Sequence, residues 1–216
     1  HVAGAQRLPA VLAAGSKLKV QEAEATAEDI AVLQYTGGTT GVAKGAMLTH
    51  RNLIANMLQA RAIMASNLKE GDETIVAPLP LYHIYAFTFQ CMAMMLTGNH
   101  NLLITNPRDL PSMIKDLSKY RFTGFVGLNT LFAALCNNPD FRKLDFSPLK
   151  MTVSGGMALQ IATAKRWTEV TGCSICEGYG MTETSPIASV NPIQNIQLGT
   201  IGIPAPSTLC KIIDDE

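Results

Sequence analysis

The sequence predicts an α/β fold in which a mostly parallel sheet is sandwiched between helices. Short apolar runs alternate with helical patterns about five times, which is typical of a parallel sheet covered on both faces. Glycine clusters follow several of the apolar runs, at residues 37–41, 155–156 and 178–180. Apolar residues make up 47% of the chain and charged residues 16%, so a globular core is expected.

Each expected strand is a short apolar run that ends at turn residues. These runs lie at residues 29–36, 73–77, 101–105, 122–128, 151–154 and 173–177. Helical periodicity is expected between them, at residues 49–66, 82–96, 110–117, from 131 onward, and 159–170. In the first of these helices Thr49 is the expected N-cap, and the buried face is expected to carry Leu53, Ile54, Met57 and Leu58.

The chain is divided into three parts on composition. Residues 1–28 form an Ala-rich lead-in, 29–192 the α/β core, and 193–216 the start of a β unit with a strand near its end. The 17 basic and 17 acidic residues cancel, so no net field attracts nucleic acid. The uncharged stretch 74–107 is interrupted by proline and asparagine and falls short of the ~20 apolar residues of a membrane span.

Five scattered cysteines do not resemble a disulfide framework, which favours a reducing, cytoplasmic compartment. Cys173 and Cys176 form a C-x-x-C pair that no second pair accompanies. We interpret both as small buried residues rather than as metal ligands or a redox pair.

The segment from Tyr35 to Gly45 reads Y-T-G-G-T-T-G-V-A-K-G. Its glycines let backbone N–H groups turn toward one point, and threonine hydroxyls and a lysine add further donors, as in a polyphosphate cradle. The spacing differs from the G-x-x-x-x-G-K-[ST] of P-loop kinases and ATPases, because Lys44 lies three residues after Gly41. The segment alone therefore indicates a phosphate-rich ligand and no particular enzyme.

This segment resembles the phosphate-binding signature of the acyl-adenylate-forming (AMP-binding) superfamily, which includes acyl-CoA synthetases, luciferases and peptide-synthetase adenylation domains. Further segments match the family in order: L-P-L-Y-H-I-Y-A at 79–86, S-G-G-M at 154–157, E-G-Y-G-M-T-E at 177–183 and G-T-I-G-I-P-A-P at 199–206. The residues of P-L-Y-H-I and N-L-L-I-T-N-P-R-D are most similar to the corresponding segments of bacterial long-chain fatty-acyl-CoA synthetases. The resemblance covers about residues 29–216. It implies the core of a luciferase-like N-terminal domain, whose last segment leads into a β-barrel.

The resemblance also implies site residues. The phosphates of ATP would contact Thr36, Gly37, Gly38, Thr39, Thr40 and Gly41, with positive charge from Lys44. The adenine side would comprise Gly155, Gly156, Met157, Glu177, Gly178, Tyr179 and Gly180, with Tyr179 stacked on the base. Thr182 would hydrogen-bond the α-phosphate, and His83 would lie between the acyl and nucleotide pockets.

Glu183 is the expected ligand of Mg²⁺, a cation that prefers carboxylate and phosphate oxygens. The implied reaction is attack of a carboxylate on the α-phosphorus, followed by transfer of the acyl group from AMP to coenzyme A. Other interpretations stay open, because Glu183 could cap a helix and Tyr179 or His83 could pack in the core.

The implied function is ATP-dependent ligation of a long-chain fatty acid to coenzyme A. An adenylating enzyme for another carboxylic acid, or a nucleotide-binding module without catalysis, remains an alternative. The family also uses an aspartate in a later T-G-D motif and a lysine in a C-terminal domain, and neither occurs here. We therefore expect a core fragment that is inactive alone. Chain-length preference, homodimerisation and peripheral attachment of the parent protein at the inner face of the membrane stay open.

Overall fold

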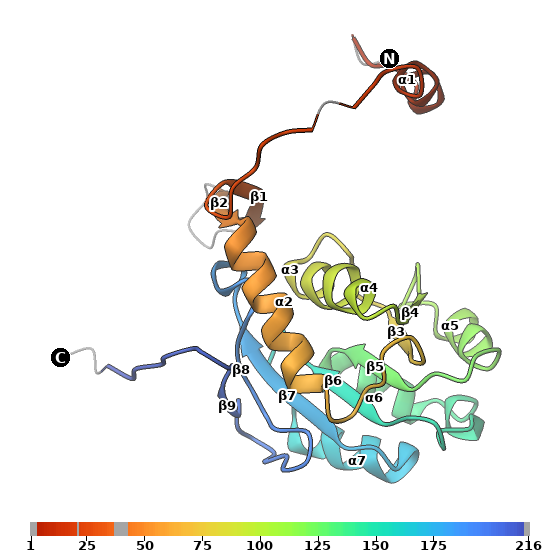
Figure 1. The fold of residues 1–216 in the computed structure, drawn as a ribbon. Helices are drawn as coiled ribbons and strands as arrows, with labels where there is room; N and C mark the ends of the chain where they lie inside the picture. Colours follow the sequence, from red (N-terminus) through yellow and green to blue (C-terminus); the bar gives the residue numbers. More distant parts are fainter. Residues whose placement is uncertain (1–3, 21, 37–42, 214–216) are drawn as a thin grey trace.

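A computed structural model of the chain describes residues 4–20, 22–36 and 43–213 (Figure 1). In these residues a central sheet has the strand order β4-β3-β5-β6-β7-β8-β9. Its strands are β3 (Thr74–Ala77), β4 (His100–Leu103), β5 (Gly124–Gly127), β6 (Met151–Ser154), β7 (Ile175–Gly180), β8 (Ile187–Val190) and β9 (Ile203–Pro204). The first five are parallel, and β8 and β9 are antiparallel. The expected mostly parallel α/β fold is confirmed.

Helices cover both faces of this sheet (Figure 1). The helices of the described residues are α1 (Leu8–Gly15), which lies apart from the sheet, and α2 (His50–Met64), α3 (Ile84–Ala86), η1 (Phe87–Ala93), α4 (Met94–Leu96), α5 (Leu110–Leu117), α6 (Asn129–Asn137), η2 (Phe141–Lys143), α7 (Ile161–Thr171) and η3 (Thr182–Thr184). α3, η1 and α4 form one continuous helix whose middle part is π-helical. Ile75 and Val126 pack with α2 and η1, whereas Val76 and Phe125 pack with α5, α6 and α7. Neighbouring strand residues thus face opposite helical layers, as the pleat requires.

The layer of α5, α6 and α7 has an aromatic core. Trp167 of α7 lies with its ring centroid 5.3 Å from that of Phe125, 4.8 Å from Phe132 and 5.6 Å from Phe141. Most of these contacts are edge-to-face or tilted, the arrangements that aromatic rings prefer. This layer gives the sheet a rigid support opposite to α2.

The first expected strand is not part of the main sheet. β1 (Ile30–Thr36) pairs antiparallel with β2 (Lys44–Thr49) in a separate two-stranded sheet. The two strands are close in sequence, which allows an antiparallel pair, whereas a parallel pair needs a long crossover. Ile30, Leu33 and Tyr35 are exposed, so this strand lacks the two buried faces of the others. The prediction of a parallel strand at 29–36 was wrong.

α2 begins with the expected cap, because Thr49 Oγ1 accepts a hydrogen bond from Asn52 N (3.2 Å). Its expected buried face was partly wrong, since α2 buries Leu53, Asn56, Ala60 and Met64, while Ile54 and Leu58 are exposed.

Asn56 explains the difference. Its Nδ2 donates to the carbonyl of Ile187 (2.9 Å), and its Oδ1 accepts from Ile187 N (3.0 Å). This pair of bonds ties α2 to β8 and turns the Asn56 face of the helix inward.

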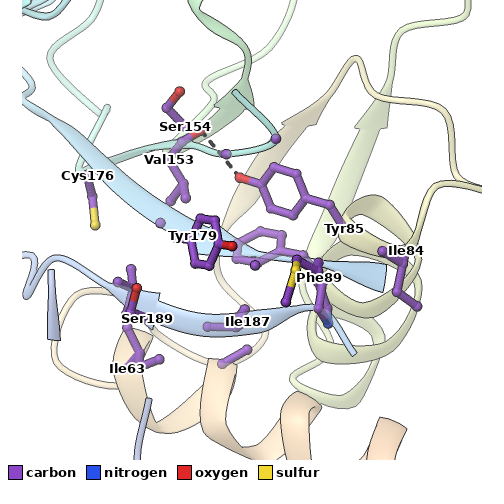
Figure 2. Close-up of a pocket in the computed structure, with 18 of the residues that line it drawn as sticks. Ile63, Ile84, Tyr85, Phe89, Val153, Ser154, Cys176, Tyr179, Ile187 and Ser189 are labelled. Carbon is purple, nitrogen blue, oxygen red and sulfur yellow. Dashed lines mark hydrogen bonds between the residues drawn. The ribbon is translucent and has the colours of Figure 1, made fainter. Parts of the chain in front are cut away.

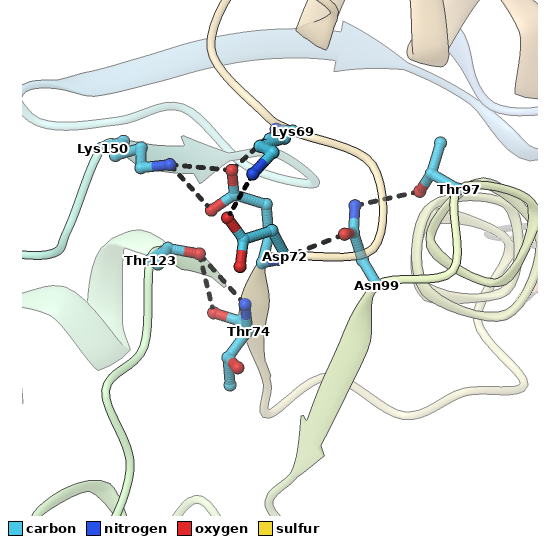
Figure 3. A network of polar contacts seen from close by, with 8 residues as sticks. Lys69, Asp72, Thr74, Thr97, Asn99, Thr123 and Lys150 are labelled. Atoms are coloured by element: carbon cyan, nitrogen blue, oxygen red, sulfur yellow. Dashed lines mark hydrogen bonds and ion pairs between the residues drawn. The ribbon is translucent and has the colours of Figure 1, made fainter.

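The amino ends of β3, β5 and β6 are joined by a polar network (Figure 3). The side chain of Glu73 is fully buried and accepts hydrogen bonds from Lys150 Nζ (2.8 and 3.1 Å) and Lys69 N (2.7 Å). Thr123 Oγ1 accepts from Thr74 N (3.1 Å), and Asn99 Oδ1 accepts from Glu73 N (3.2 Å). These polar groups, most of them at or next to the start of a strand, are thereby paired with one another.

The two ends of the described chain differ from the core. α1 buries no residue and lies apart from the sheet in Figure 1. The described residues 205–213 contain a turn and no strand, so the strand expected near the end of the chain does not occur in them. The expected start of a β-barrel is therefore not confirmed. The three-part division of the chain stays a prediction.

Candidate functional site

The carboxyl ends of β6 and β7 border a cavity of about 280 Å³. Its walls come from β6, β7 and β8, from the last turns of α2 and from the helix that begins at Ile84 (Figure 2). Ligand sites of parallel sheets lie at this edge. Three glycine clusters were expected to line one crevice: those at 155–156 and 178–180 both line this cavity, and the one at 37–41 lies outside the described residues.

The cavity has two chemically different parts. Its mouth carries polar, aromatic and glycine residues that are mostly exposed: His83, Gly155, Gly156, Tyr179 and Thr182. Its interior is lined by apolar side chains: Ile63, Met64, Phe89, Val153, Ile187 and Ile193. A few polar groups at one end of an apolar body suit an amphipathic ligand with a polar head.

Tyr85 lies between the two parts. Its hydroxyl donates to the carbonyl of Val153 (3.5 Å), and its ring meets Phe89 edge-to-face (Figure 2). A Cβ on Gly155 would lie 3.1 Å from the Tyr85 ring, so glycine allows this close approach. Burial raises the pKa of Tyr85 well above its ordinary value, so the phenol stays neutral.

Tyr179 stands on β7 with 45% of its surface exposed. β7 extends through Gly178 to Gly180, so the strand expected to end at Glu177 is longer. A Cβ on Gly180 would lie 2.0 Å from the carbonyl oxygen of Pro186, and one on Gly178 would lie 3.4 Å from that of Ser189. At Gly180 in particular, glycine is therefore needed for the close contact of β7 with the chain leading into β8. This contact leaves the Tyr179 ring at the cavity mouth.

Thr182 and Glu183 form the turn η3 directly after β7. Thr182 lines the cavity, whereas the exposed Glu183 lies outside its lining. Thr184 caps the turn, because its Oγ1 accepts from Met181 N (2.9 Å). The capping role that Glu183 could have had in this turn is thus taken by its neighbour Thr184.

The remaining adenine-side residues are placed differently from one another. Gly156 has φ +81°, a conformation that favours glycine, and it lines the cavity. Met157 is exposed and outside the lining. Glu177 is buried, and its Oε1 accepts from Leu159 N (2.8 Å). Glu177 therefore ties β7 to the loop after β6, a contact that sequence reasoning missed.

The structure describes only the two ends of the segment 35–45, which resembles the phosphate-binding signature. Gly37, Gly38, Thr39, Thr40 and Gly41 lie outside the described residues. Thr36 pairs with Lys44 in the β1–β2 register, and both stand at the end of the hairpin. β2 contacts η3, so the hairpin lies beside the turn that carries Thr182. Lys44 is exposed and outside the cavity lining.

His83 lines the cavity mouth as an exposed side chain. Its Nδ1 accepts a hydrogen bond from Tyr85 N (3.2 Å), which caps α3. Because Nδ1 accepts, the proton of the neutral ring resides on Nε2. The alternative of a packed core histidine is wrong.

The C-x-x-C pair is buried, as expected. Thr152 Oγ1 donates to Cys173 Sγ (3.6 Å), and Cys176 Sγ donates to the carbonyl of Asn191 (2.9 Å). Burial, with a smaller contribution from the Glu177 carboxylate, raises the pKa of Cys176 to about 12. A thiol of this kind stays protonated and unreactive at neutral pH.

Sequence reasoning missed the apolar interior of the cavity. One face at the end of α2 carries Ala60, Ile63 and Met64. Their helical spacing is the sequence signal that could have identified them as one apolar surface. Ile187 and Ile193 lie between the recognised motifs at 177–183 and 199–206 and carried no such signal. They reach the cavity because β8 turns back along β7.

The comparisons with known proteins agree with this geometry. The sequence profile of the family of AMP-binding enzymes matches residues 3–216. The long-chain-fatty-acid–CoA ligase of Salmonella typhimurium is 50% identical over the whole chain, which spans 39% of that relative.

Two solved structures are similar in fold. The anthranilate CoA ligase AuaEII, in complex with anthranoyl-AMP, matches with a TM-score of 0.79 at 28% identity, over 91% of this chain and 38% of its own. A long-chain-fatty-acid–CoA ligase from Archaeoglobus fulgidus matches with a TM-score of 0.69 at 29% identity, over 82% of this chain and 37% of its own. With a family profile that covers nearly every residue and a glycine-lined cavity at the carboxyl edge, the chain belongs to the AMP-binding enzyme family.

Proposed function

We propose that this chain is the nucleotide- and acyl-binding core of an ATP-dependent long-chain fatty acid:CoA ligase. The observation that carries the proposal is the cavity at the carboxyl edge of the sheet, with a glycine-rich mouth and an apolar interior. An acyl-adenylate has the same division, with a charged nucleotide at one end and a hydrocarbon chain at the other. Half of the residues are identical to those of a Salmonella long-chain ligase, which supports this choice of acid.

The nucleotide lies at the cavity mouth in this proposal. Tyr179 stacks on the adenine, which its exposed ring permits, and Gly155 and Gly156 let the base approach the backbone. Thr182 donates to the α-phosphate from the cavity wall. The β- and γ-phosphates lie toward the hairpin end, where Lys44 adds positive charge.

The acyl chain lies in the apolar interior. The wall here is formed by Val153, Ile187 and Phe89. Because these side chains are apolar, a hydrocarbon can pack against them without desolvating a charged group. His83 stands at the junction and holds a proton on Nε2, so it can donate a hydrogen bond to the reacting carboxylate. Transfer of the chain from water to this wall stabilises binding by about 0.8 kcal/mol for each buried methylene.

The reaction joins two anions, which is its main electrostatic difficulty. A carboxylate oxygen attacks the α-phosphorus, the bond to the β-phosphate oxygen breaks, and pyrophosphate leaves. The thiol of coenzyme A then attacks the acyl carbonyl and releases AMP. Fixed donors at Thr182 and the positive charge of Lys44 stabilise the negative charge that the phosphates carry.

The residues at the mouth fit a magnesium ion held mainly by its substrate. Within the described residues no group of three or more His, Cys, Asp and Glu side chains could hold a metal alone. Mg²⁺ usually takes one or two carboxylates and completes its shell with phosphate and water. Glu183, an exposed carboxylate next to Thr182, matches this mode. When bound there, Mg²⁺ supplies charge neutralisation of the phosphates.

None of the helices in residues 4–20, 22–36 and 43–213 has the length and apolar character to cross a bilayer. We place the parent protein in the cytoplasm, with peripheral contact to the inner face of the membrane where long-chain acids partition. The proposed substrate and the five free cysteines, three of which are buried, support this placement.

An exchange assay tests the proposal. The full-length protein is expected to exchange pyrophosphate into ATP with palmitate, and to do so far more slowly with acetate, benzoate or an amino acid. The chain alone is expected to bind AMP but to exchange slowly or not at all. Exchange that prefers benzoate or an amino acid would reassign the acid, and AMP binding without exchange by the full-length protein would indicate a binding module.

A further inference from the structure

A second, smaller hollow shares a wall residue with the apolar interior of the main cavity. Its volume is about 80 Å³, and its wall includes Met64, Leu68, Met94 and Thr97. The ion pair between Arg61 and Glu70 (2.6 Å), with both side chains about half exposed, borders this hollow. The hollow is thus apolar in its inner part and bordered by charge toward solvent.

Met64 belongs to the walls of both hollows. It is the last residue of α2, and 5% of its surface is exposed. It packs in one cluster with Ala60, Phe89 and Met94. Methionine is unbranched and has several rotatable bonds, so its side chain can take another rotamer at small cost. Among the described residues, this flexible side chain is the one that lines both hollows.

The volumes show why this side chain matters for a long chain. Compared with the second hollow, at about 80 Å³, the main cavity is three to four times as large, at about 280 Å³. Part of that space lies at the mouth, where the polar residues stand. A movement of the Met64 side chain would add the space of the second hollow to the apolar end of the main cavity.

We propose that Met64 sets the acyl chain length, by closing the main cavity to medium chains and turning aside so that the end of a long chain enters the second hollow. This inference rests on the proposed function, because it assumes that the apolar interior holds the acyl chain. It adds the residue that limits that chain and the place where its end lies.

The test uses the complete protein that contains this chain and measures kcat/KM for octanoate, laurate, palmitate and stearate. Met64→Ala joins the two hollows, so the ratio of stearate to octanoate is expected to rise about tenfold. Met64→Phe places a rigid ring in the wall that the hollows share, so the same ratio is expected to fall about tenfold. Met64→Leu serves as a second variant if the phenylalanine variant does not fold.

Met57→Ala is the matched control. Met57 lies on the same helix and packs in the same cluster, but it lines neither hollow, so the stearate to octanoate ratio is expected to stay within a factor of two of wild type.

The outcomes separate the inference from the proposed function. If the wild-type protein ligates fatty acids, and the Met64 variants change kcat/KM by the same factor for every chain length, as Met57→Ala does, the role of Met64 is overturned. If the wild-type protein ligates no fatty acid, the proposed function fails as well.

Discussion

The two edges of the parallel sheet are built in opposite ways. At the amino edge a fully buried Glu73 meets Lys150 and the backbone of Lys69, and the polar groups that Figure 3 shows are paired with one another. At the carboxyl edge glycines and a cavity replace such pairs, and Ser154 Oγ and Ser189 Oγ are buried without a partner among the described residues. The amino edge therefore stabilises the sheet, whereas the carboxyl edge leaves hydrogen-bond donors and space for a ligand.

The largest effect is expected from the carboxyl edge, at a glycine that leaves no room for a side chain. Gly180→Ala puts a Cβ 2.0 Å from the Pro186 carbonyl oxygen, a backbone atom that has little room to move. The free energy of unfolding is expected to fall by about 3 kcal/mol or more. Urea unfolding followed by circular dichroism measures it.

Gly45→Ala is the control for this substitution, because its Cβ would meet the Tyr35 ring at an ordinary 3.5 Å. Equal stability of the two variants would show that the β7–β8 contact is not as tight as described.

The next effect is expected at the amino edge. Lys150→Met leaves the Glu73 carboxylate buried with the Lys69 backbone donor and without its cation, at a cost of about 2 kcal/mol in unfolding free energy. Lys119→Met removes an exposed pair with Asp116 and is expected to cost less than about 1 kcal/mol. Palmitate exchange by the folded Lys150→Met protein is expected to be unchanged. A loss of exchange with intact folding would contradict the division of roles between the edges.

A smaller effect is expected for nucleotide binding. Tyr179→Ala removes the aromatic face at the cavity mouth, and AMP is expected to bind about tenfold more weakly by calorimetry. Tyr120→Ala is a matched control, because Tyr120 is also 45% exposed but lies against His100, away from the cavity. Neither variant is expected to lose much stability. The same AMP affinity for both would remove Tyr179 from the site.

The smallest effect is a dependence of stability on pH. Burial alone would raise the pKa of Glu73, but hydrogen bonds from Lys150 and Lys69 outweigh it and hold the pKa below the ordinary 4.5. Because the pKa is lowered in the folded state, the stabilisation is complete above the unfolded pKa. It is lost as the pH falls from about 5 through the folded pKa. Unfolding free energies between pH 6 and about pH 3 are expected to fall less steeply for Glu73→Gln than for wild type. Parallel curves would exclude this contribution.

Periodicity predicted the parts of the fold that depend on local burial. Met113, Ile114 and Leu117 share a buried face of α5 because their spacing matches the helix, and no distant residue alters it. Thr49 was recognised as a cap for the same local reason. The antiparallel pairing of β1 was not predictable, because an isolated apolar run does not encode the direction of its partner.

The sequence predicted the glycines of the candidate site, but it did not predict the apolar interior of the cavity. Gly155, Gly156 and Tyr179 belong to recognisable motifs, and they meet at one cavity. The inward turn of Asn56 depends on its bonds to Ile187, which is 131 residues away in sequence. The structural contact of Glu177 with Leu159 depends likewise on the position of a neighbouring strand. Contacts of this kind arise from the assembled sheet and leave no periodic signal.

The aromatic core has a practical consequence. Trp167 is the single tryptophan of the chain, it is fully buried, and its Nε1 donates to Thr152 Oγ1 (3.1 Å). It stands in the helical layer opposite to the cavity, so its intrinsic fluorescence reports whether that layer is packed and is little affected by ligands at the mouth. A red shift of its emission would mark unfolding of the scaffold. Adding AMP or a fatty acid should leave the emission wavelength unchanged, which gives the protein a built-in probe that separates loss of folding from loss of binding.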